Sequence, residues 1–549
     1  MTTSVWSKFP PNAWRAILIG GLALHIILAA SAAWIETPTV DEFAHVPAGM
    51  SYWKHGEWSL YSKNPPVLKL WMTLPVVLGI AGPANTPDVK VEPFRWGPWL
   101  YGAEFEKENS QNYLRIFFAA RMMVIVLSSA AGLLIFLWAN QLSGKIPAAL
   151  AAFGFWLSPT VLAHGHLATV DIGAALVIFG LCYFLFAMPD KPKISTLLIC
   201  GLLFGLALTT KFSALFVLPW VVYVLATRAK GYRIKALAVS AISCLLAIQI
   251  VFGFSSLATF KKDYESKSKL GRRVVSLVPD WFPIPLPRYF IEGLDAQLAD
   301  AETGEFGNYL NGEWSQTGWW YYNLESLGLK EHPASIVLIF LIPFAIRKKR
   351  FKTLLPIIGP LVLLAIPLLF LNPLQVGIRY LLPLFPFLFL LMAMIFDNFK
   401  IAMRLSPLIL AAWTWSAIAT APHYLSYFNS IAREFGNPET LLLDSNFDWG
   451  QDLYRLKNMA AQATPPFGLM YFGHVSPAEY GISYQLIPDH PVKGLLAVSA
   501  NLLEGMDYPV LAPDGTWVAT EKDHLKWLRG LTPIRREGSI FIFDTRGTD

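Results

Sequence analysis

Charged side chains are scarce in this chain: Asp, Glu, Lys and Arg together make up 15% of its 549 residues. A typical soluble domain carries about a quarter charged residues, so these charges are too few to cover a water-facing surface. With 54% hydrophobic residues and a mean hydropathy of +0.44, the sequence also excludes a disordered chain. The apolar residues form long blocks separated by polar stretches. This pattern indicates a polytopic membrane protein.

Cysteine is almost absent as well. The three cysteines, Cys182, Cys200 and Cys244, all lie in apolar blocks and lack metal-ligand spacing. Because the polar regions contain no cysteine, we expect no disulfide framework there. The net charge of +6 comes from short loops between the apolar blocks and not from a basic face of a soluble domain. The charge therefore predicts no nucleic-acid partner.

The apolar blocks are long enough to span a bilayer, which takes about 20 residues of helix. The sequence predicts eleven spans, near residues 14–34, 115–140, 146–163, 172–188, 194–210, 212–227, 235–254, 333–346, 353–371, 380–396 and 401–420. Several contain Pro or Gly, which membrane helices tolerate. An alternative for the first block is a cleaved secretory signal ending at Ser31-Ala32-Ala33, although the apolar run to Trp34 is long for one.

The distribution of basic residues predicts the orientation of these spans. With the N-terminus inside, the inside segments hold sixteen basic and two acidic residues, and Lys8 and 347–350 contribute to this excess. The outside segments 35–113, 255–332 and 421–549 hold 24 basic and 35 acidic residues. This positive-inside bias predicts a cytoplasmic N-terminus and an extracytoplasmic C-terminus.

The first outside loop opens with an acidic stretch, Thr39-Val40-Asp41-Glu42-Phe43-Ala44-His45, directly after the first span. If this stretch is helical, Asp41 and His45 share one face at i, i+4. Such a face suits a general base with an orienting partner, or part of a metal site. The alternative is an N-capped interfacial helix that carries acidic residues in its first turn.

Other polar groups lie at the same ends of the predicted spans. They are Lys63, Asn64 and Lys69 in the first loop, His164, His166 and Asp171 between the third and fourth spans, Lys211 between the fifth and sixth, and Arg379 before the tenth. No acid lies within a span away from these ends, where an ion pathway would need one. Carboxylates and cations at one membrane boundary suit transfer chemistry on an anionic, membrane-embedded substrate.

The order of these motifs carries a family resemblance. An Asp-Glu pair follows the first span, Asn64-Pro65-Pro66 lies beside a Lys, an acid follows the third span, and Arg379-Tyr380 precedes a Pro-rich span. The set resembles the GT-C superfamily of polyprenyl-phosphate-sugar-dependent glycosyltransferases, in particular bacterial relatives of the protein O-mannosyltransferases and the lipid A aminoarabinose transferases. The likeness covers about residues 14–420. The stretches 312–322 and 444–452 are also similar to bacterial members.

The resemblance implies roles for individual residues. It places Asp41 on the catalytic acid, Glu42 on its neighbour, and Arg379 and Lys211 on positions that bind the donor phosphate. The aminoarabinose transferases read an acid and then Lys-Pro-Pro where this chain reads Lys63-Asn64-Pro65-Pro66, so a metal ligand and a phosphate contact are missing. Lys63 or Lys69 would then supply the phosphate contact. Supporting roles are expected for His45, Asn64, His164, His166 and Asp171, and a divalent metal would have Asp41, His45 and Asp171 as candidate ligands.

The predicted fold class is an all-α polytopic, GT-C-like membrane protein with a small C-terminal extracytoplasmic α/β domain. The transmembrane catalytic domain would cover residues 1–420 and the α/β domain 421–549. Strands are expected at 441–443, 467–472, 494–499 and 539–543, and helices at 452–462 and near 521–529. The 444–452 loop lacks the Gly and Glu of an EF-hand and is expected to anchor this domain.

The leading hypothesis for function is an inverting membrane glycosyltransferase of the bacterial inner membrane, surrounded by membrane lipids. Its donor would be a sugar on polyprenyl phosphate, its acceptor a protein, lipid or glycan hydroxyl, and Asp41 the general base. An oligosaccharide or phosphoglycolipid transferase with a metal at Asp41, His45 and Asp171 is the alternative within this class. The rival from another class is a membrane transporter or lipid flippase, which the lack of evident repeats and of mid-span charges disfavours.

Overall fold

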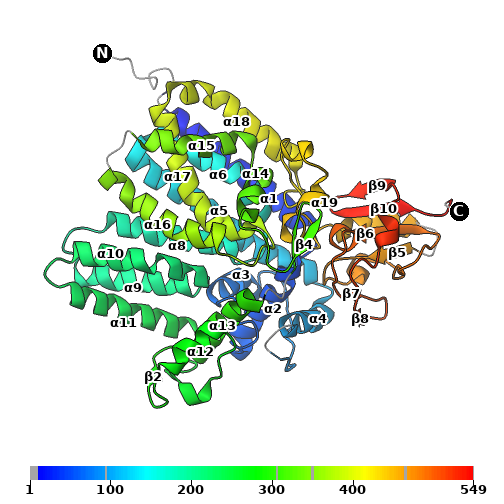
Figure 1. Cartoon of the computed structure of the whole chain (residues 1–549), viewed down its shortest axis with the longest axis horizontal. Helices are drawn as coiled ribbons and strands as arrows, with labels where there is room; N and C mark the ends of the chain where they lie inside the picture. Colours follow the sequence, from blue (N-terminus) through cyan, green and yellow to red (C-terminus); the bar gives the residue numbers. More distant parts are fainter. Residues whose placement is uncertain are drawn as a thin grey trace.

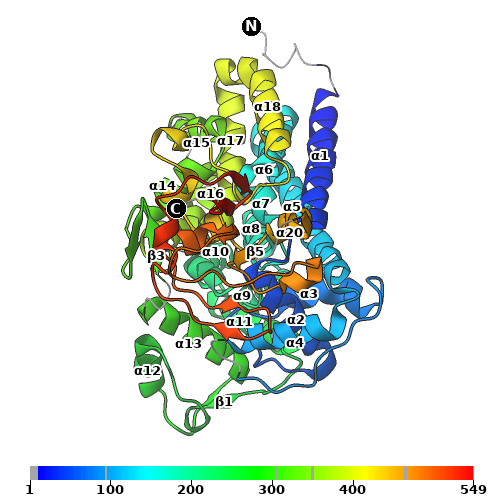
Figure 2. The ribbon, with the colours of Figure 1, turned by 90° about the vertical axis from the view of Figure 1, so that its right-hand side faces the viewer.

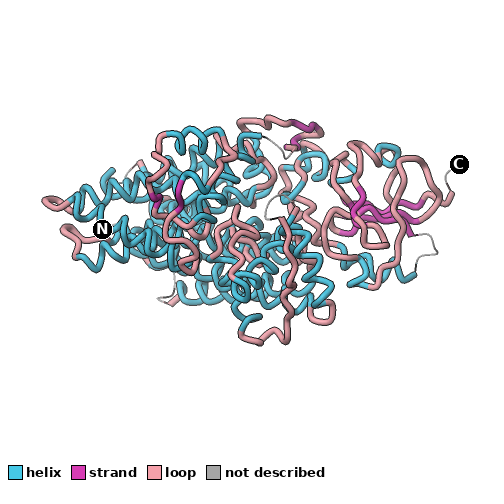
Figure 3. The backbone as a smooth tube through the Cα atoms, turned by 90° about the horizontal axis from the view of Figure 1, so that it is seen from below, coloured by secondary structure: helices cyan, strands magenta, loops and turns pink. Residues whose placement is uncertain are grey.

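The computed structural model describes residues 10, 12–92, 96–303, 307–347, 351–462 and 467–547. Lys8 and residues 348–350 of the orientation count lie outside the described residues. Most of the described chain is helical, and the strands of a small sheet gather at one end of the long axis (Figure 3). The all-α membrane fold class is thus confirmed, with small sheets in the C-terminal region.

Each of the eleven predicted spans is occupied by an apolar helix. Within the described part of the chain, six helices are long and apolar enough to cross a membrane: α1 (Ala13–Ile35), α5 (Tyr113–Ser143), α11 (Arg233–Val251), α16 (Phe351–Phe370), η4–α17 (Ile378–Asn398) and α18 (Lys400–Thr420). The other five spans are shorter apolar helices: α6 (Lys145–Leu157) with α7 (Pro159–His164), α8 (Asp171–Ala187), α9 (Ile194–Leu208), η2–α10 (Phe212–Arg228) and α15 (Pro333–Ile346). The protein is therefore a multi-pass membrane protein. One more short apolar helix, α3 (Val67–Val77), was not among the predicted spans.

Two helices form the centre of the bundle. Every residue of α6 from Pro147 to Leu157 is buried, and 83% of the apolar window in η4–α17 is buried. Small residues allow this close packing. A Cβ at Gly154 would lie 2.7 Å from the Trp413 ring of α18, and one at Gly132 of α5 would lie 2.3 Å from the Trp156 ring. Large side chains therefore pack directly against neighbouring backbones.

Loop helices collect at the end of the bundle that carries the C-terminal domain, which we call the loop end (Figures 1 and 2). The first loop forms α2 (Val40–His55) and α4 (Gly97–Asn109). The loop 255–332 forms α12 (Lys269–Ser276), α13 (Arg288–Thr303), α14 (Tyr322–Lys330) and the two-stranded pairs β1 (Thr259–Phe260) with β2 (Pro283–Ile284) and β3 (Asn308–Leu310) with β4 (Glu313–Ser315). Residues 41–45 are helical and lie at the start of α2, so Asp41 and His45 are one turn apart.

The C-terminal region folds around a four-stranded sheet of order β5-β6-β10-β9. Its strands are β5 (Phe467–Met470), β6 (Leu495–Ser499), β9 (Arg535–Glu537) and β10 (Ile540–Asp544), and a short pair joins β7 (Val510–Leu511) to β8 (Trp517–Val518). β5 runs parallel to β6, whereas β10 is antiparallel to both of its neighbours. Three of the four predicted strands are thus confirmed.

Three local predictions in this region were wrong. Leu441 ends the short helix α19 (Pro438–Leu441), and residues 442–443 lead into a turn instead of a strand. The predicted helix over 452–462 is divided into η7 (Leu453–Leu456) and α20 (Lys457–Gln462). Near 521–529 only the turn η9 (Lys526–Leu528) forms. In the first two cases tertiary contacts override the local pattern, because residues 444–446 and Asp452 are hydrogen-bonded to distant segments.

Candidate active site

Four charged side chains from distant parts of the sequence alternate in sign at the loop end; we call them the charge row. Asp41 of α2 accepts a hydrogen bond from Arg379 of η4, with an Nη1–Oδ2 distance of 2.6 Å. The same Nη1 lies 3.7 Å from Oδ2 of Asp171, at the start of α8. The Oδ1 of Asp171 accepts a hydrogen bond of 2.5 Å from the Lys211 ammonium, which follows α9. The row therefore runs Asp41–Arg379–Asp171–Lys211.

Aromatic rings flank the cations of the charge row. The Arg379 guanidinium lies 4.4 Å from the centre of the Trp449 ring, and the Lys211 ammonium lies 4.9 Å from that of Tyr380. The side chains of Asp41 and Arg379 are 15% and 12% exposed, whereas Asp171 is buried. Among the described residues, Arg379 Nε has no hydrogen-bond partner. The row therefore keeps an unused donor in a partly desolvated place, where charge interactions are stronger than in water.

His45 completes the polar surroundings of Asp41. It lies one helical turn after Asp41, is buried, and packs its ring 5.1 Å from that of Tyr61. Burial lowers the pKa of His45 to about 4, while the charge of Asp41 opposes this change, so the ring is neutral at pH 7. Neither ring nitrogen has a hydrogen-bond partner among the described residues.

The candidate metal ligands Asp41, His45 and Asp171 do not form a metal site in this structure. Within the described ranges, no group of three or more His, Cys, Asp or Glu side chains is arranged to hold a metal ion. The physical reason is Arg379, whose guanidinium lies between the two carboxylates and pairs with both. A cation between them would have to displace this guanidinium, so the residues do not fit a metal in this arrangement.

Glu42, predicted as a catalytic neighbour of Asp41, is fully enclosed and bonded on all sides. Both of its carboxylate oxygens pair with Arg121 of α5, at 2.7 and 2.8 Å. The main-chain N–H groups of Thr39 and Ala168 also donate to it, at 2.9 and 2.7 Å. Burial alone would raise the pKa of Glu42, but Arg121 and these donors lower it on balance. Glu42 therefore acts as the helix-capping acid that the alternative interpretation of this stretch predicted. Asp41 instead belongs to the charge row.

The remaining predicted site residues lie outside the charge row. The buried Lys69 ammonium donates to the main-chain carbonyls of Tyr61 (2.6 Å) and Asn64 (2.5 Å). Lys63 pairs with Asp300 of α13 at 2.7 Å. His166 is buried and bonded to Glu36 at 2.9 Å, whereas His164 packs 6.3 Å from the Trp449 ring. The structure thus gives Lys63 and Lys69 protein partners that do not belong to the charge row.

The loop 444–452 approaches the charge row from the C-terminal domain, and the sequence analysis did not place it there. Ser445 Oγ donates to the Val376 carbonyl at 2.5 Å, and the Asn446 side chain accepts from the Ile378 N–H at 2.9 Å. A Cβ at Gly377 would lie 2.0 Å from Ser445 Oγ, so only glycine permits this approach. The loop thereby fixes the backbone immediately before Arg379.

Asp444 brings a third carboxylate toward the row. Its backbone has φ +54°, a left-handed conformation that non-glycine residues rarely adopt, and its N–H is held by the Asn501 side chain at 2.9 Å. Burial raises the pKa of Asp444 to about 7, against the lowering effect of Arg379. The spacing of acids in this loop was visible in the sequence, but the direction in which Asp444 points was not.

Comparisons with known proteins add a family likeness. Residues 115–253 match the family model of dolichyl-phosphate-mannose-protein mannosyltransferases. The chain resembles GT-C glycosyltransferases. This segment, about a quarter of the chain, contains Asp171 and Lys211 of the charge row as well as Arg121, whereas Asp41 and Arg379 lie on either side of it. No curated protein matches the sequence.

Two solved structures are also similar to this chain. ArnT from Cupriavidus metallidurans bound to undecaprenyl phosphate is 14% identical, with 98% of this chain and 99% of that chain covered and a TM-score of 0.47. The oligosaccharyltransferase of Archaeoglobus fulgidus in complex with Zn and sulfate is 10% identical, with 92% and 73% covered and a TM-score of 0.44.

Proposed function

We propose that this protein transfers a sugar from a polyprenyl-phosphate donor to an acceptor hydroxyl on the extracytoplasmic side of the membrane. The observation that carries the proposal is the charge row, in which Arg379 and Lys211 alternate with Asp41 and Asp171 where apolar helices end. Two cations at a membrane boundary suit a ligand with an apolar tail and an anionic head. The predicted orientation puts this end outside the cytoplasm.

The donor phosphate would bind to the cations of the row. Arg379 supports this assignment most directly, because its Nε–H is unused among the described residues and its Nη1 already holds a carboxylate oxygen. A phosphate oxygen has the same charge and acceptor chemistry as that carboxylate oxygen. Lys211 then contributes a second positive charge beside the Tyr380 ring.

Arrival of the phosphate would change the partner of Arg379. In the structure Asp41 and Arg379 form an ion pair, which keeps the carboxylate from acting as a base. A phosphate that takes over the guanidinium releases Asp41, so the base becomes available only when the donor is bound. This exchange couples donor binding to catalysis.

The transfer itself would be a single displacement with inversion. The acceptor oxygen attacks the anomeric carbon, the bond from that carbon to the phosphate oxygen breaks, and its electron pair leaves with the polyprenyl phosphate. Asp41 takes the acceptor proton, and Arg379 and Lys211 stabilise the charge that develops on the leaving phosphate. Glu42 would act only by positioning, because it fixes the start of α2 through Arg121.

The proposal is tested with purified full-length protein in liposomes, labelled polyprenyl-phosphate sugar, and candidate protein, lipid and glycan acceptors. The expected result is transferred label that depends on Asp41. Movement of intact donor across the bilayer without any glycosidic product would contradict the proposal and support a flippase instead. Dependence of transfer on an added divalent metal would also contradict the metal-free arrangement of the charge row.

A further inference from the structure

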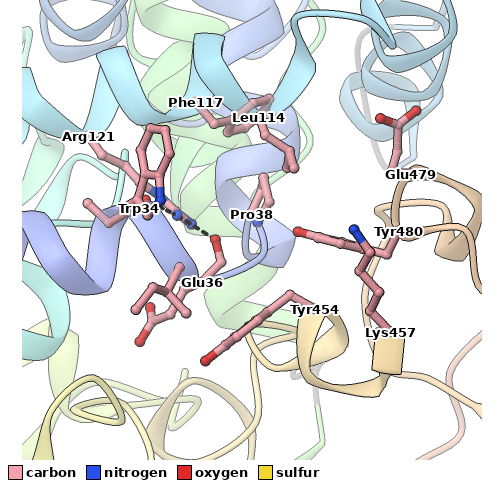
Figure 4. A pocket seen from close by; sticks show the side chains of 12 residues that line it. Trp34, Glu36, Pro38, Leu114, Phe117, Arg121, Tyr454, Lys457, Glu479 and Tyr480 are labelled. Carbon is pink, nitrogen blue, oxygen red and sulfur yellow. Dashed lines mark hydrogen bonds between the residues drawn. The ribbon is translucent and has the colours of Figure 1, made fainter. Parts of the chain in front are cut away.

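A groove of about 330 Å³ opens on another side of the loop end, between the ends of α1 and α5 and the C-terminal domain (Figure 4). Its walls come from the last turn of α1 with Pro38, from the first turns of α5, and from the segments around Tyr454 and Tyr480. No part of the proposed transfer chemistry uses it. The groove joins a transmembrane surface to a water-facing domain.

The two halves of the groove differ in polarity. The membrane half presents Trp34, Ile35, Leu114 and Phe117, of which Trp34 is 71% and Leu114 40% exposed. Tryptophan is enriched at the membrane–water boundary, so Trp34 marks the level at which lipid headgroups begin. The opposite half presents the ammonium of Lys457 and the carboxylate of Glu479 (Figure 4). An apolar half at the bilayer and a charged half beyond it match the polarity of a phospholipid.

The charges of this half are available to a ligand. Among the described residues, neither Lys457 nor Glu479 forms an ion pair, and Lys457 is exposed while Glu479 is partly exposed. The deeper Arg121 is not available, because it is bonded to Glu42 and to the main-chain carbonyls of Ala33, Glu36 and Thr37. This buried pair separates the groove from Asp41, so the groove is not an entrance to the charge row.

We infer that the groove binds the headgroup of a zwitterionic phospholipid that carries a primary ammonium, of the phosphoethanolamine type. The phosphate would lie at Lys457, the ammonium would donate to Glu479, and an acyl chain would run along Trp34 and Leu114. A purely anionic headgroup would leave Glu479 facing a negative charge. A quaternary ammonium would reach Glu479 without any N–H to donate. Both charged groups of the groove therefore select the same lipid class.

The experiment offers the full-length protein in detergent an equimolar mixture of dioleoyl phosphatidylethanolamine, phosphatidylcholine and phosphatidylglycerol and counts bound lipids by native mass spectrometry. One added charge-assisted contact should favour phosphatidylethanolamine about threefold to tenfold over each of the others. Equal binding of the three lipids by the wild-type protein, or an excess of phosphatidylglycerol, would overturn the inference. This comparison needs no variant and does not depend on the proposed transferase activity.

Variants then locate the preference in the groove. Lys457→Ala and Glu479→Gln should each reduce the ratio of bound phosphatidylethanolamine to the other lipids to near one. Glu479→Lys should make phosphatidylglycerol the preferred lipid, because both charged groups of the groove are then positive. The matched controls Lys526→Ala and Glu521→Gln change exposed charges elsewhere in the same domain and should keep the preference. An equal loss in the controls, or no change with Glu479→Lys, would show that the lipids bind elsewhere and refute the assignment.

Discussion

Replacement of Arg379 by alanine should weaken donor binding strongly, because this guanidinium is the cation of the charge row with an unused N–H. A charge-assisted hydrogen bond contributes about 1.5–3 kcal/mol, which corresponds to about a 10- to 150-fold increase in the donor Kd. The Nη1–Oδ2 distance of 2.6 Å to Asp41 shows that an anionic oxygen fits at this position. Because Asp41 competes with the phosphate for Nη1 of Arg379, the measured loss of donor affinity should fall toward the lower part of this range.

Arg379→Lys separates the charge from the geometry. The lysine keeps the positive charge but loses the planar fork and its contact over the Trp449 ring at 4.4 Å. We therefore expect donor affinity between those of the wild type and Arg379→Ala. Lys63→Ala is the matched control, since Lys63 pairs with Asp300 of α13 and with no member of the row, and its donor affinity should stay within about twofold of the wild type.

The assay is equilibrium binding of labelled polyprenyl-phosphate sugar to the purified protein in detergent, with the thermal unfolding temperature measured in parallel to confirm folding. Wild-type donor affinity in a folded Arg379→Ala variant would refute the reasoning, because the row would then not hold the phosphate. An equal loss in Lys63→Ala would refute it as well, since it would indicate a general effect of positive charge.

Four further predictions concern the base, its support, one buried acid and the orientation. Asp41→Asn should lower turnover about 10²- to 10⁴-fold without weakening donor binding, as single-turnover and binding measurements would show. Glu42→Gln should destabilise the fold by about 3–5 kcal/mol, measured by denaturant unfolding, because its buried arginine partner loses its counter-charge. Burial raises the pKa of Asp448 to about 7, so its contribution makes the fold less stable as the pH rises from about 4 to about 7, and Asp448→Asn should reduce this slope of the unfolding temperature, of which Asp444 keeps a share. A cysteine at Asp514 should react with an impermeant thiol reagent in spheroplasts and one at Lys230 should not, against a low background because the three native cysteines are buried.

The position of the charge row was only partly accessible to sequence analysis. Asp41, Asp171, Lys211 and Arg379 were identified as candidates because each follows or precedes an apolar span on the same predicted side. Their pairing was not predictable, since Asp41 and Arg379 are 338 residues apart and no local pattern encodes that contact. Arg121 could have been noticed, because a charge within an apolar span needs a buried partner. That partner proved to be Glu42, which removes Glu42 from the reacting groups.

The sequence alone determined the membrane class, the positions of the eleven apolar helices and three strands of the C-terminal sheet. These features follow from local chemistry, because a span needs a continuous apolar segment and a strand needs a short apolar run between turns. The tertiary structure decided which charges meet, that Lys69 donates to main-chain carbonyls, and that the 444–452 loop fixes the backbone before Arg379. In a desolvated interior each charge must find its partner wherever the chain brings one, and that depends on how distant segments pack rather than on the residues beside it.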